Sequence, residues 1–148
     1  MSFRSQDRRT GTDATTVARR IHLDLIDGMG RSIDLTAGFV FDAADPYAVT
    51  LTFYTDGPEV TWSFARDLLA TGVREPAGTG DVHVWPSVDR DGRPVTVIEL
   101  QSPGGQALLQ APTSDISAFV TATQSVVPAG EESAHLDLDS LVDALLAV

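Results

Sequence analysis

The stretch VTWSFARDLLATG, residues 60–72, contains the change of hydrophobic period that decides the fold. In its first half every second residue is apolar, which is typical of a strand with one buried face. In its second half the apolar residues recur three and four positions apart, which is typical of a short helix. These positions are Val60, Trp62 and Phe64, followed by Ala65, Leu68 and Leu69. A strand therefore leads directly into a helix, and Gly72 is placed to cap that helix.

Three strands are expected before this stretch. Residues 17–25 alternate apolar and polar side chains, apart from Arg19, and residues 33–41 alternate in the same way. Between them, residues 27–30 (Asp-Gly-Met-Gly) tolerate the backbone conformations of a hairpin turn. Residues 49–53 form the third strand. Short turns between strands indicate antiparallel pairing.

Three more strands are expected after the short helix. Residues 82–85 form a strand that ends at Pro86, and a turn follows at residues 89–92. Residues 95–100 and 107–109 form two strands on either side of a Pro-Gly-Gly turn. The sequence thus predicts four strands before the short helix and three after it.

Two further helices are expected at the C-terminal end. The longer one is predicted from apolar and small residues at spacings of three and four: Ile116, Phe119, Val120, Thr123 and Val127. Thr113 or Ser114 is suited to cap its start, and the chain breaks at Pro128 and Gly130. The tail helix carries a stripe of Leu141, Val142, Leu145 and Leu146, with Asp139 or Ser140 as its cap. The stripe either docks on its own domain or binds a partner.

The length of 148 residues corresponds to one domain. Residues 1–15 are polar and contain three arginines, so we assign them to a flexible leader, with a basic partner-contacting arm as the alternative. Residues 16–148 form the single domain. No run of the chain approaches the roughly 18 apolar residues of a membrane span, so membrane insertion is not expected. The absence of cysteine fits a reducing cytoplasm.

The charge of the chain argues against nucleic acid as a partner. The formal net charge is -11, all ten basic residues are arginines, and the last of them is Arg93. An acidic surface repels phosphate backbones and anionic lipid. The absence of lysine also excludes Schiff-base chemistry and a phosphate-loop lysine.

The sequence predicts no catalytic residue, no metal and no cofactor. The histidines His22, His83 and His135 fall on separate predicted elements, whereas a catalytic zinc takes three protein ligands. The segment 78–80 (Gly-Thr-Gly) precedes a strand rather than a helix, so it is interpreted as a turn and not as a phosphate cradle. Asp89 and its neighbours lack the bidentate glutamate of a calcium loop.

Candidate interaction residues remain. Trp62 shares a strand face with Val60 and Phe64 and is expected in the core. Trp85 falls on the opposite face to Val82 and Val84, so it lies either on a second covered face or at a subunit interface. Arg66 and Asp67 are expected on the outer side of the short helix, either solvated or in contact with a partner. The full candidate set for a partner or subunit interface is Tyr47, Arg66, Asp67, Trp85, Leu141, Val142 and Leu145.

Several contiguous runs resemble the SsgA-like family of sporulation-specific cell division proteins. They are DPYAV at 45–49, FARDLL at 64–69, GTGDV at 78–82 and VWP at 84–86. Matches at Ser102-Pro103, Gly105, 107–109 (ALL) and Ala111-Pro112 continue the similarity, which spans residues 17–146. The segment 135–139 (HLDLD) looks most like the SsgB branch of that family. The arginine-bearing leader departs from that branch.

The resemblance implies a fold and a role. The expected fold is α+β and Whirly-like: two mostly antiparallel sheets with a long and a short helix plus a C-terminal helix. Because four plus four strands are then expected, an eighth strand is expected either near Glu75 to Thr79 or from a strand that is split elsewhere. The implied role is a non-enzymatic adaptor, cytoplasmic and concentrated at septum sites, which binds FtsZ and an SsgA-type protein and forms a homo-oligomer, with a trimer favoured. The alternatives are a single-stranded nucleic-acid-binding module, favoured by the fold alone, and a small enzyme.

Overall fold

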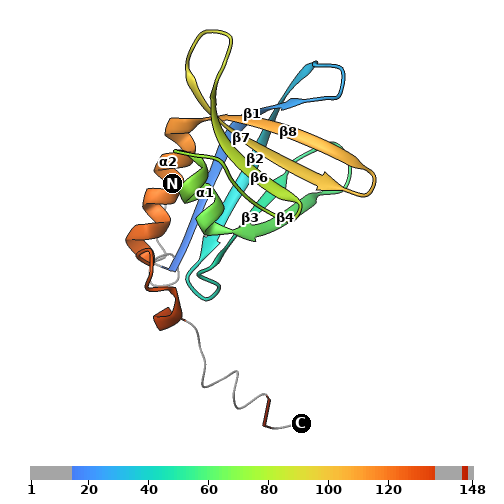
Figure 1. Cartoon of the computed structure of the whole chain (residues 1–148). Helices are drawn as coiled ribbons and strands as arrows, with labels where there is room; N and C mark the ends of the chain where they lie inside the picture. The colour runs from blue at the N-terminus through green and yellow to red at the C-terminus, as the bar shows by residue number, and fades with distance from the viewer. Residues whose placement is uncertain (1–14, 136–144, 147–148) are drawn as a thin grey trace, which may run out of the picture.

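The computed structural model describes residues 15–135 and 145–146 (Figure 1). Within them lies one sheet with two helices packed against its concave side. The elements are β1 (Thr16–Ile26), β2 (Ser32–Asp42), β3 (Ala48–Phe53), β4 (Val60–Ala65), α1 (Arg66–Gly72), β5 (Ala77–Thr79), β6 (Val82–Val88), β7 (Pro94–Ser102), β8 (Gly105–Pro112), α2 (Thr113–Val126) and the short 3₁₀ turn η2 (Glu132–His135).

The strands form a single eight-stranded sheet in the order β4-β3-β2-β1-β8-β7-β6-β5, with every neighbouring pair antiparallel. The expectation of an α+β fold is confirmed, but the expectation of two sheets is wrong. The two four-stranded meanders are joined where Asp24, Leu25 and Ile26 of β1 pair with β8. Because these three residue pairs join the meanders, the strands form one sheet, and strand twist curls it around the helices instead of leaving two separate layers.

The eighth strand lies in the first of the two expected places, near Glu75 to Thr79. β5 covers Ala77–Thr79 and pairs with β6, with Gly78 opposite His83. The imidazole of His83 lies directly over Gly78, so any larger side chain there would overlap with it. Gly80 then turns the chain with φ of 60°, a left-handed conformation that glycine adopts at no steric cost. Gly78 and Thr79 are therefore strand residues and only Gly80 turns the chain, so the interpretation of the whole Gly-Thr-Gly segment as a turn is correct for Gly80 and wrong for the two residues before it.

Alternation along each strand sends one set of side chains into a common core. The largest fully buried side chains are Phe39, Phe41, Phe119, Leu23, Leu51, Leu69, Ile98, Leu109, Ile116, Val49, Val84 and Val127. Phe39 of β2 meets Phe119 of α2 edge to face, with ring centroids 5.6 Å apart. The predicted stripe of the long helix is confirmed, because Ile116, Phe119, Val120 and Thr123 are all buried.

Two predicted helix caps are wrong. Gly72 is the last residue of α1 and packs against Val84, where an added Cβ would overlap with the valine side chain. Its small size allows the helix to approach the sheet closely, and the helix ends through the backbone at Val73. At the start of α2, Pro112 occupies the cap position and no side chain caps the helix. The Thr113 hydroxyl instead bonds to the Thr96 hydroxyl at 3.0 Å.

Both long hairpins turn around an aspartate. The Asp27 carboxylate accepts bonds from the amides of Met29 and Arg31, and the Asp89 carboxylate accepts bonds from the amides of Asp91 and Arg93. This local capping of a turn is the usual use of aspartate at such positions. It also accounts for Asp89 without a calcium loop. None of the helices in the described part of the chain combines the length and apolar character needed to span a bilayer.

Candidate partner-binding surface

Arg66 is buried rather than displayed. The first residue of α1 is 3% exposed, and its guanidinium lies over the ring of Phe41, 4.9 Å from the centroid. One guanidinium nitrogen donates to the carbonyl oxygens of Thr123 at 3.3 Å and Val127 at 2.7 Å. The other donates to the Glu132 carboxylate at 2.8 Å. The prediction that Arg66 is on the outer side of the helix is therefore wrong.

The partners of Arg66 explain its burial. The last carbonyls of a helix lack intrahelical partners and carry the negative end of the helix dipole. Arg66 supplies both hydrogen bonds and positive charge to the end of α2, and Glu132 balances the remaining charge. The hydrogen bond from Arg66 lowers the pKa of the Glu132 carboxyl below its ordinary value. α1 is therefore held between the sheet and α2, and two of its sides are covered.

Asp67 and Tyr47 are exposed near Arg66. Tyr47 is 51% exposed, and its carbonyl accepts the Arg66 amide at 2.7 Å. Asp67 lines a shallow hollow between α1 and α2 together with Arg74 and Gln124. Tyr47 and Asp67 thus lie next to Arg66 and are exposed, whereas the Arg66 side chain itself is buried.

Trp85 lies on another part of the sheet. It is half-buried on β6, on the same face as His83 and opposite to Val84. Together with Gly78 and Glu99 these side chains line a shallow hollow beside β5. The His83 Nδ1 atom is 3.5 Å from a Glu99 carboxylate oxygen. The prediction that Trp85 shares the face of His83 is confirmed, and a role in a subunit interface stays a prediction.

Only a small part of the tail is described. Leu141 and Val142 lie outside the described residues, so their assignment to a helical stripe stays a prediction. Leu145 is 65% exposed and Leu146 is 78% exposed. The described part of the tail thus presents apolar side chains to solvent.

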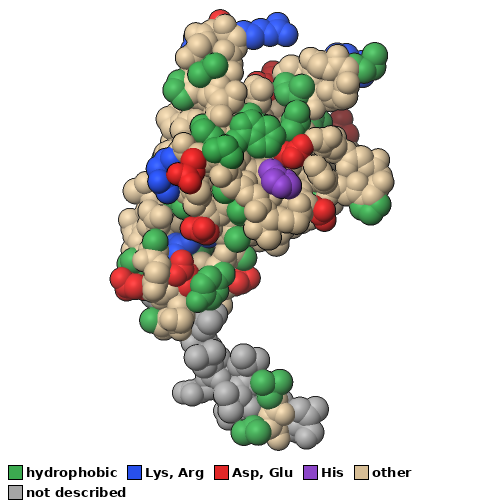
Figure 2. Space-filling view, viewed as in Figure 1, with side chains coloured by type: hydrophobic (Ala, Val, Ile, Leu, Met, Phe, Trp, Pro, Cys, Tyr) green, Lys and Arg blue, Asp and Glu red, His purple; other side chains and the backbone are tan. Residues whose placement is uncertain are grey.

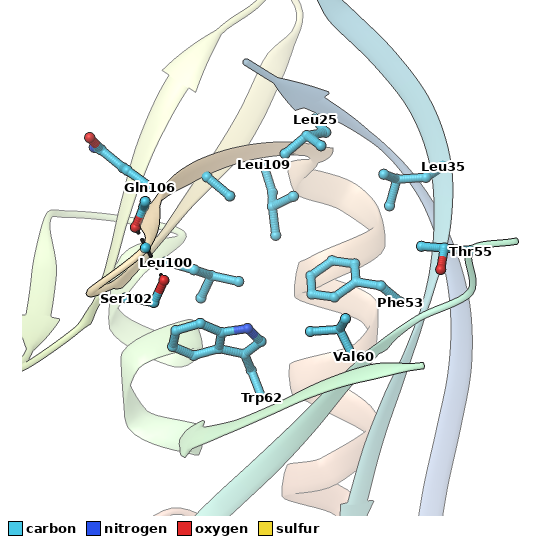
Figure 3. Close-up of a pocket in the computed structure, with 13 residues that line it drawn as sticks. Leu25, Leu35, Phe53, Thr55, Val60, Trp62, Leu100, Ser102, Gln106 and Leu109 are labelled. Carbon is cyan, nitrogen blue, oxygen red and sulfur yellow. Dashed lines mark hydrogen bonds between the residues drawn. The ribbon is translucent and has the colours of Figure 1, made fainter. Parts of the chain in front are cut away.

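An apolar hollow opens at one end of the curled sheet (Figure 3). It has a volume of about 350 Å³ and is lined from both meanders. Trp62, Val60 and Phe53 face Leu25, Leu100 and Leu109 across it, and the polar groups of Ser102 and Gln106 lie toward its edge. Among the described residues, no charged one lines it. Trp62, expected in the core, therefore packs against the core on one side and is accessible from the hollow on the other.

A small polar cluster lies on the outer face of β1 and β2. His22, Asp24 and Asp34 place one donor atom each within 4.8 Å of one another, a set that could hold a cation. The Asp24 pKa is raised, first by a hydrogen bond with the Asp34 carboxyl and then by burial and the Asp34 charge. His22 and Asp34 are well exposed, and exposed acidic side chains often gather in this way without binding an ion.

Sequence reasoning missed the hollow and the polar cluster for different reasons. The alternation along the first four strands predicts that Leu25, Leu35 and Phe53 point inward. It does not predict that these side chains stay partly uncovered at one end of the sheet. The polar cluster could in principle have been predicted from the sequence. His22 and Asp24 share a strand face, and the register of the hairpin places Asp24 opposite Asp34.

The surface shows no basic stripe on the face seen in Figure 2. Acidic and apolar side chains are interspersed there, and the arginines are few and separated. A basic stripe along one face is the usual footprint of a nucleic-acid-binding protein.

The chain matches known proteins over most of its length. The family model described as Streptomyces sporulation and cell division protein, SsgA, matches residues 35–132. Sporulation-specific cell division protein SsgB of Streptomyces coelicolor is 48% identical over 134 residues, which is 90% of this chain and 97% of that protein. SsgB of Frankia casuarinae is 41% identical over 132 residues, 88% of this chain and 92% of that protein.

Two solved structures share the fold. A structure of SsgB, described with mutations that correlate to longitudinal cell division during sporulation of Streptomyces coelicolor, superposes with a TM-score of 0.77 at 46% identity. The similarity covers 82% of this chain and 96% of that one. An SsgA-like sporulation-specific cell division protein from Thermobifida fusca superposes with a TM-score of 0.80 at 34% identity, covering 91% of this chain and 98% of that one.

Fold and surface together define a small α+β protein whose single curled sheet encloses two helices and opens onto an apolar hollow. The chain belongs to the SsgA-like family of sporulation and cell division proteins. The expected family resemblance is confirmed, including its SsgB side, since the two relatives named above are both SsgB proteins.

Proposed function

We propose that this protein is a non-enzymatic adaptor that recruits or positions FtsZ at septum sites during sporulation. The observation that carries the proposal is the similarity to SsgB proteins over about nine-tenths of the chain. A cytoplasmic location with concentration at septa, and an SsgA-type protein as second partner, belong to the same proposal. An adaptor needs exposed contact surfaces, and the exposed Tyr47, Asp67 and Leu145 and the apolar hollow provide candidates.

Co-sedimentation with FtsZ polymers tests this proposal. Purified protein is mixed with FtsZ in the presence of GTP, the polymers are pelleted, and the bound fraction is measured against FtsZ held unassembled in GDP. We expect the protein to enter the pellet in proportion to polymer. If it stays in the supernatant both with FtsZ alone and with FtsZ plus an SsgA-type protein, the adaptor proposal fails.

We further propose that the protein self-associates, with a trimer favoured. Open antiparallel sheets leave edges and faces that oligomers commonly cover, and closed symmetric assemblies are the usual solution. The candidate interface aromatics are Tyr47, in the turn before β3, and Trp85, on β6. Light scattering coupled to size exclusion measures the mass directly. The oligomer should persist at protein concentrations on the order of tens of micromolar. If only monomer is found at that concentration, the proposal is contradicted.

A further inference from the structure

β4 has a free edge. It pairs with β3 on one side, and among residues 15–135 and 145–146 no strand pairs with its other side. The Arg66 amide bonds to the Tyr47 carbonyl, which continues the ladder between the two strands. Because paired and unpaired residues alternate in an antiparallel ladder, the backbone groups of Thr61, Ser63 and Ala65 point away from β3. They form a row of donors and acceptors along the edge.

The two edges of the sheet differ in how they are protected. β5, at the opposite edge, has three residues and follows Pro76, and short edge strands with nearby proline resist pairing with other chains. β4 has six residues, VTWSFA, and contains neither a charge nor a proline. Natural sheets usually blunt an edge of this kind. An unprotected edge strand is therefore suited to accept another strand.

Hollows lie along this edge. The apolar hollow at the open end of the sheet includes Val60 and Trp62. A second hollow runs from Trp62 to Ala65 and reaches Val82 on the other side. Trp62 lines both, so the two hollows adjoin along β4. A strand added to β4 would place alternate side chains over them, which is how β-addition sites combine backbone bonding with side-chain pockets.

The charge around the edge has one sign. Asp56 and Glu59 lie exposed in the turn that leads into β4, and Asp81 lines the second hollow. In the part of the chain that the structure describes, no arginine lines either hollow. A ligand segment that alternates apolar residues with lysine or arginine would match both features. Its apolar side chains would enter the hollows and its cations would face the three carboxylates.

We infer that the free edge of β4 and its two hollows form a β-addition site for an extended, basic and apolar segment of a partner protein. The inference deepens the proposed adaptor function by stating the chemistry of the segment that a partner offers. Acidic segments are disfavoured there. Residues 136–148 of this chain carry Asp137, Asp139 and Asp143 without a base, so their charge is opposite to what the edge selects. A second copy would bring a second β4 with the same three acids.

Amide hydrogen exchange followed by NMR tests the site in the wild-type protein. The probe is a short synthetic peptide of alternating lysine and valine with a central leucine, and its control carries glutamate in place of lysine. The lysine peptide should slow the exchange of Thr61, Ser63 and Ala65, with an every-second-residue pattern. The glutamate peptide should leave them unchanged. Equal protection by both peptides, or protection confined to other strands, overturns the inference.

Variants test the backbone and charge contributions separately. Ser63→Pro removes one outward amide without touching the β3 ladder, and proline is tolerated at edge positions of this kind. We expect the lysine peptide to bind about tenfold more weakly to it, whereas Ser63→Ala should bind like wild type. Glu59→Lys should weaken binding roughly three- to tenfold, while Asp91→Lys, the same charge change on the distant β6–β7 turn, should have little effect. Equal losses in the two lysine variants would mean general charge attraction and overturn the site.

Other occupants give distinct results. If a second copy occupies the edge, Thr61, Ser63 and Ala65 are protected in the free protein at high concentration and lose protection on dilution. If Ser63→Pro does not fold, the site is still tested by the wild-type exchange pattern and by the comparison of Glu59→Lys with Asp91→Lys. Failure of the wild type to pellet with FtsZ, together with peptide protection at β4, removes the adaptor proposal and leaves the site standing. If the wild type pellets with FtsZ but the peptide protects no amide of β4, the adaptor proposal stands and the β4 site is overturned.

Discussion

At the scale of single residues, Arg66 shows how a buried charged side chain can hold a helix end in the interior of the protein. Its guanidinium satisfies carbonyls at the end of α2, contacts the Phe41 ring and pairs with Glu132. The sequence pattern of α1 gave no sign of this, because the partners lie 57 and 61 residues away along the chain. A charge beside an apolar stripe looks the same in sequence whether solvent or another helix covers it.

Replacing Arg66 with Met should therefore destabilise the protein strongly. The variant leaves the Val127 carbonyl at the end of α2 without its donor, and a buried acceptor left unsatisfied costs about 1–3 kcal/mol. Urea unfolding measures the change in the free energy of unfolding. Arg74→Met is the matched control, since Arg74 is exposed near the other end of α1, and its effect should stay within about 0.5 kcal/mol. If both variants change the free energy of unfolding equally and only slightly, the stabilising contacts described for Arg66 are contradicted.

The same contact predicts a pH dependence. Arg66 lowers the pKa of Glu132 in the folded protein below the ordinary value of 4.5, so the folded state binds this proton less tightly than the unfolded state. The Glu132 contribution to stability is thus present above the unfolded pKa and lost as pH falls through the folded one. Wild type should be more stable than Glu132→Gln near neutral pH, and the difference should close in acid. A difference that grows on acidification would show that the sign is wrong.

At the scale of elements, local patterns predicted most of the fold. The strands, the hairpin turns at Asp27 and Asp89 and the buried stripe of α2 follow from period and turn chemistry, which act within a few residues. The single sheet could not be predicted in that way. It depends on three residue pairs between β1 and β8, which are far apart in sequence. The β4 edge and its hollows depend on the same strand order, so they could not be predicted from local sequence patterns either.

Gly72 offers a test of how closely α1 approaches the sheet. An exposed Gly→Ala change in a helix normally stabilises by about 0.5–1 kcal/mol. Here the added Cβ would overlap with Val84, so Gly72→Ala should destabilise by about 1–3 kcal/mol. Thermal melts of Gly72→Ala and of Gly28→Ala, where a Cβ meets open space, make the comparison. A stabilised Gly72→Ala variant would contradict the close packing of α1 on β6.

At the scale of the whole molecule, charge separates an adaptor from a nucleic-acid-binding module. With a net charge of -11, little counterion release is available to drive association with a phosphate backbone. We expect no useful affinity for single-stranded DNA at physiological salt, as measured by fluorescence anisotropy of a labelled oligonucleotide. Sub-micromolar binding that weakens steeply with salt would show that a local arginine patch overrides the overall charge.

The central claim is that this protein acts in sporulation septation as the SsgB proteins it resembles are named to do. The most direct measurement is complementation in a Streptomyces coelicolor strain that lacks its own SsgB, with sporulation septa counted by fluorescence microscopy of membrane and cell wall. The account predicts that the wild-type chain restores regularly spaced septa, while Arg66→Met, which should be less stable, restores fewer of them. Wild-type protein that accumulates to the level of native SsgB and restores no septa would contradict the account.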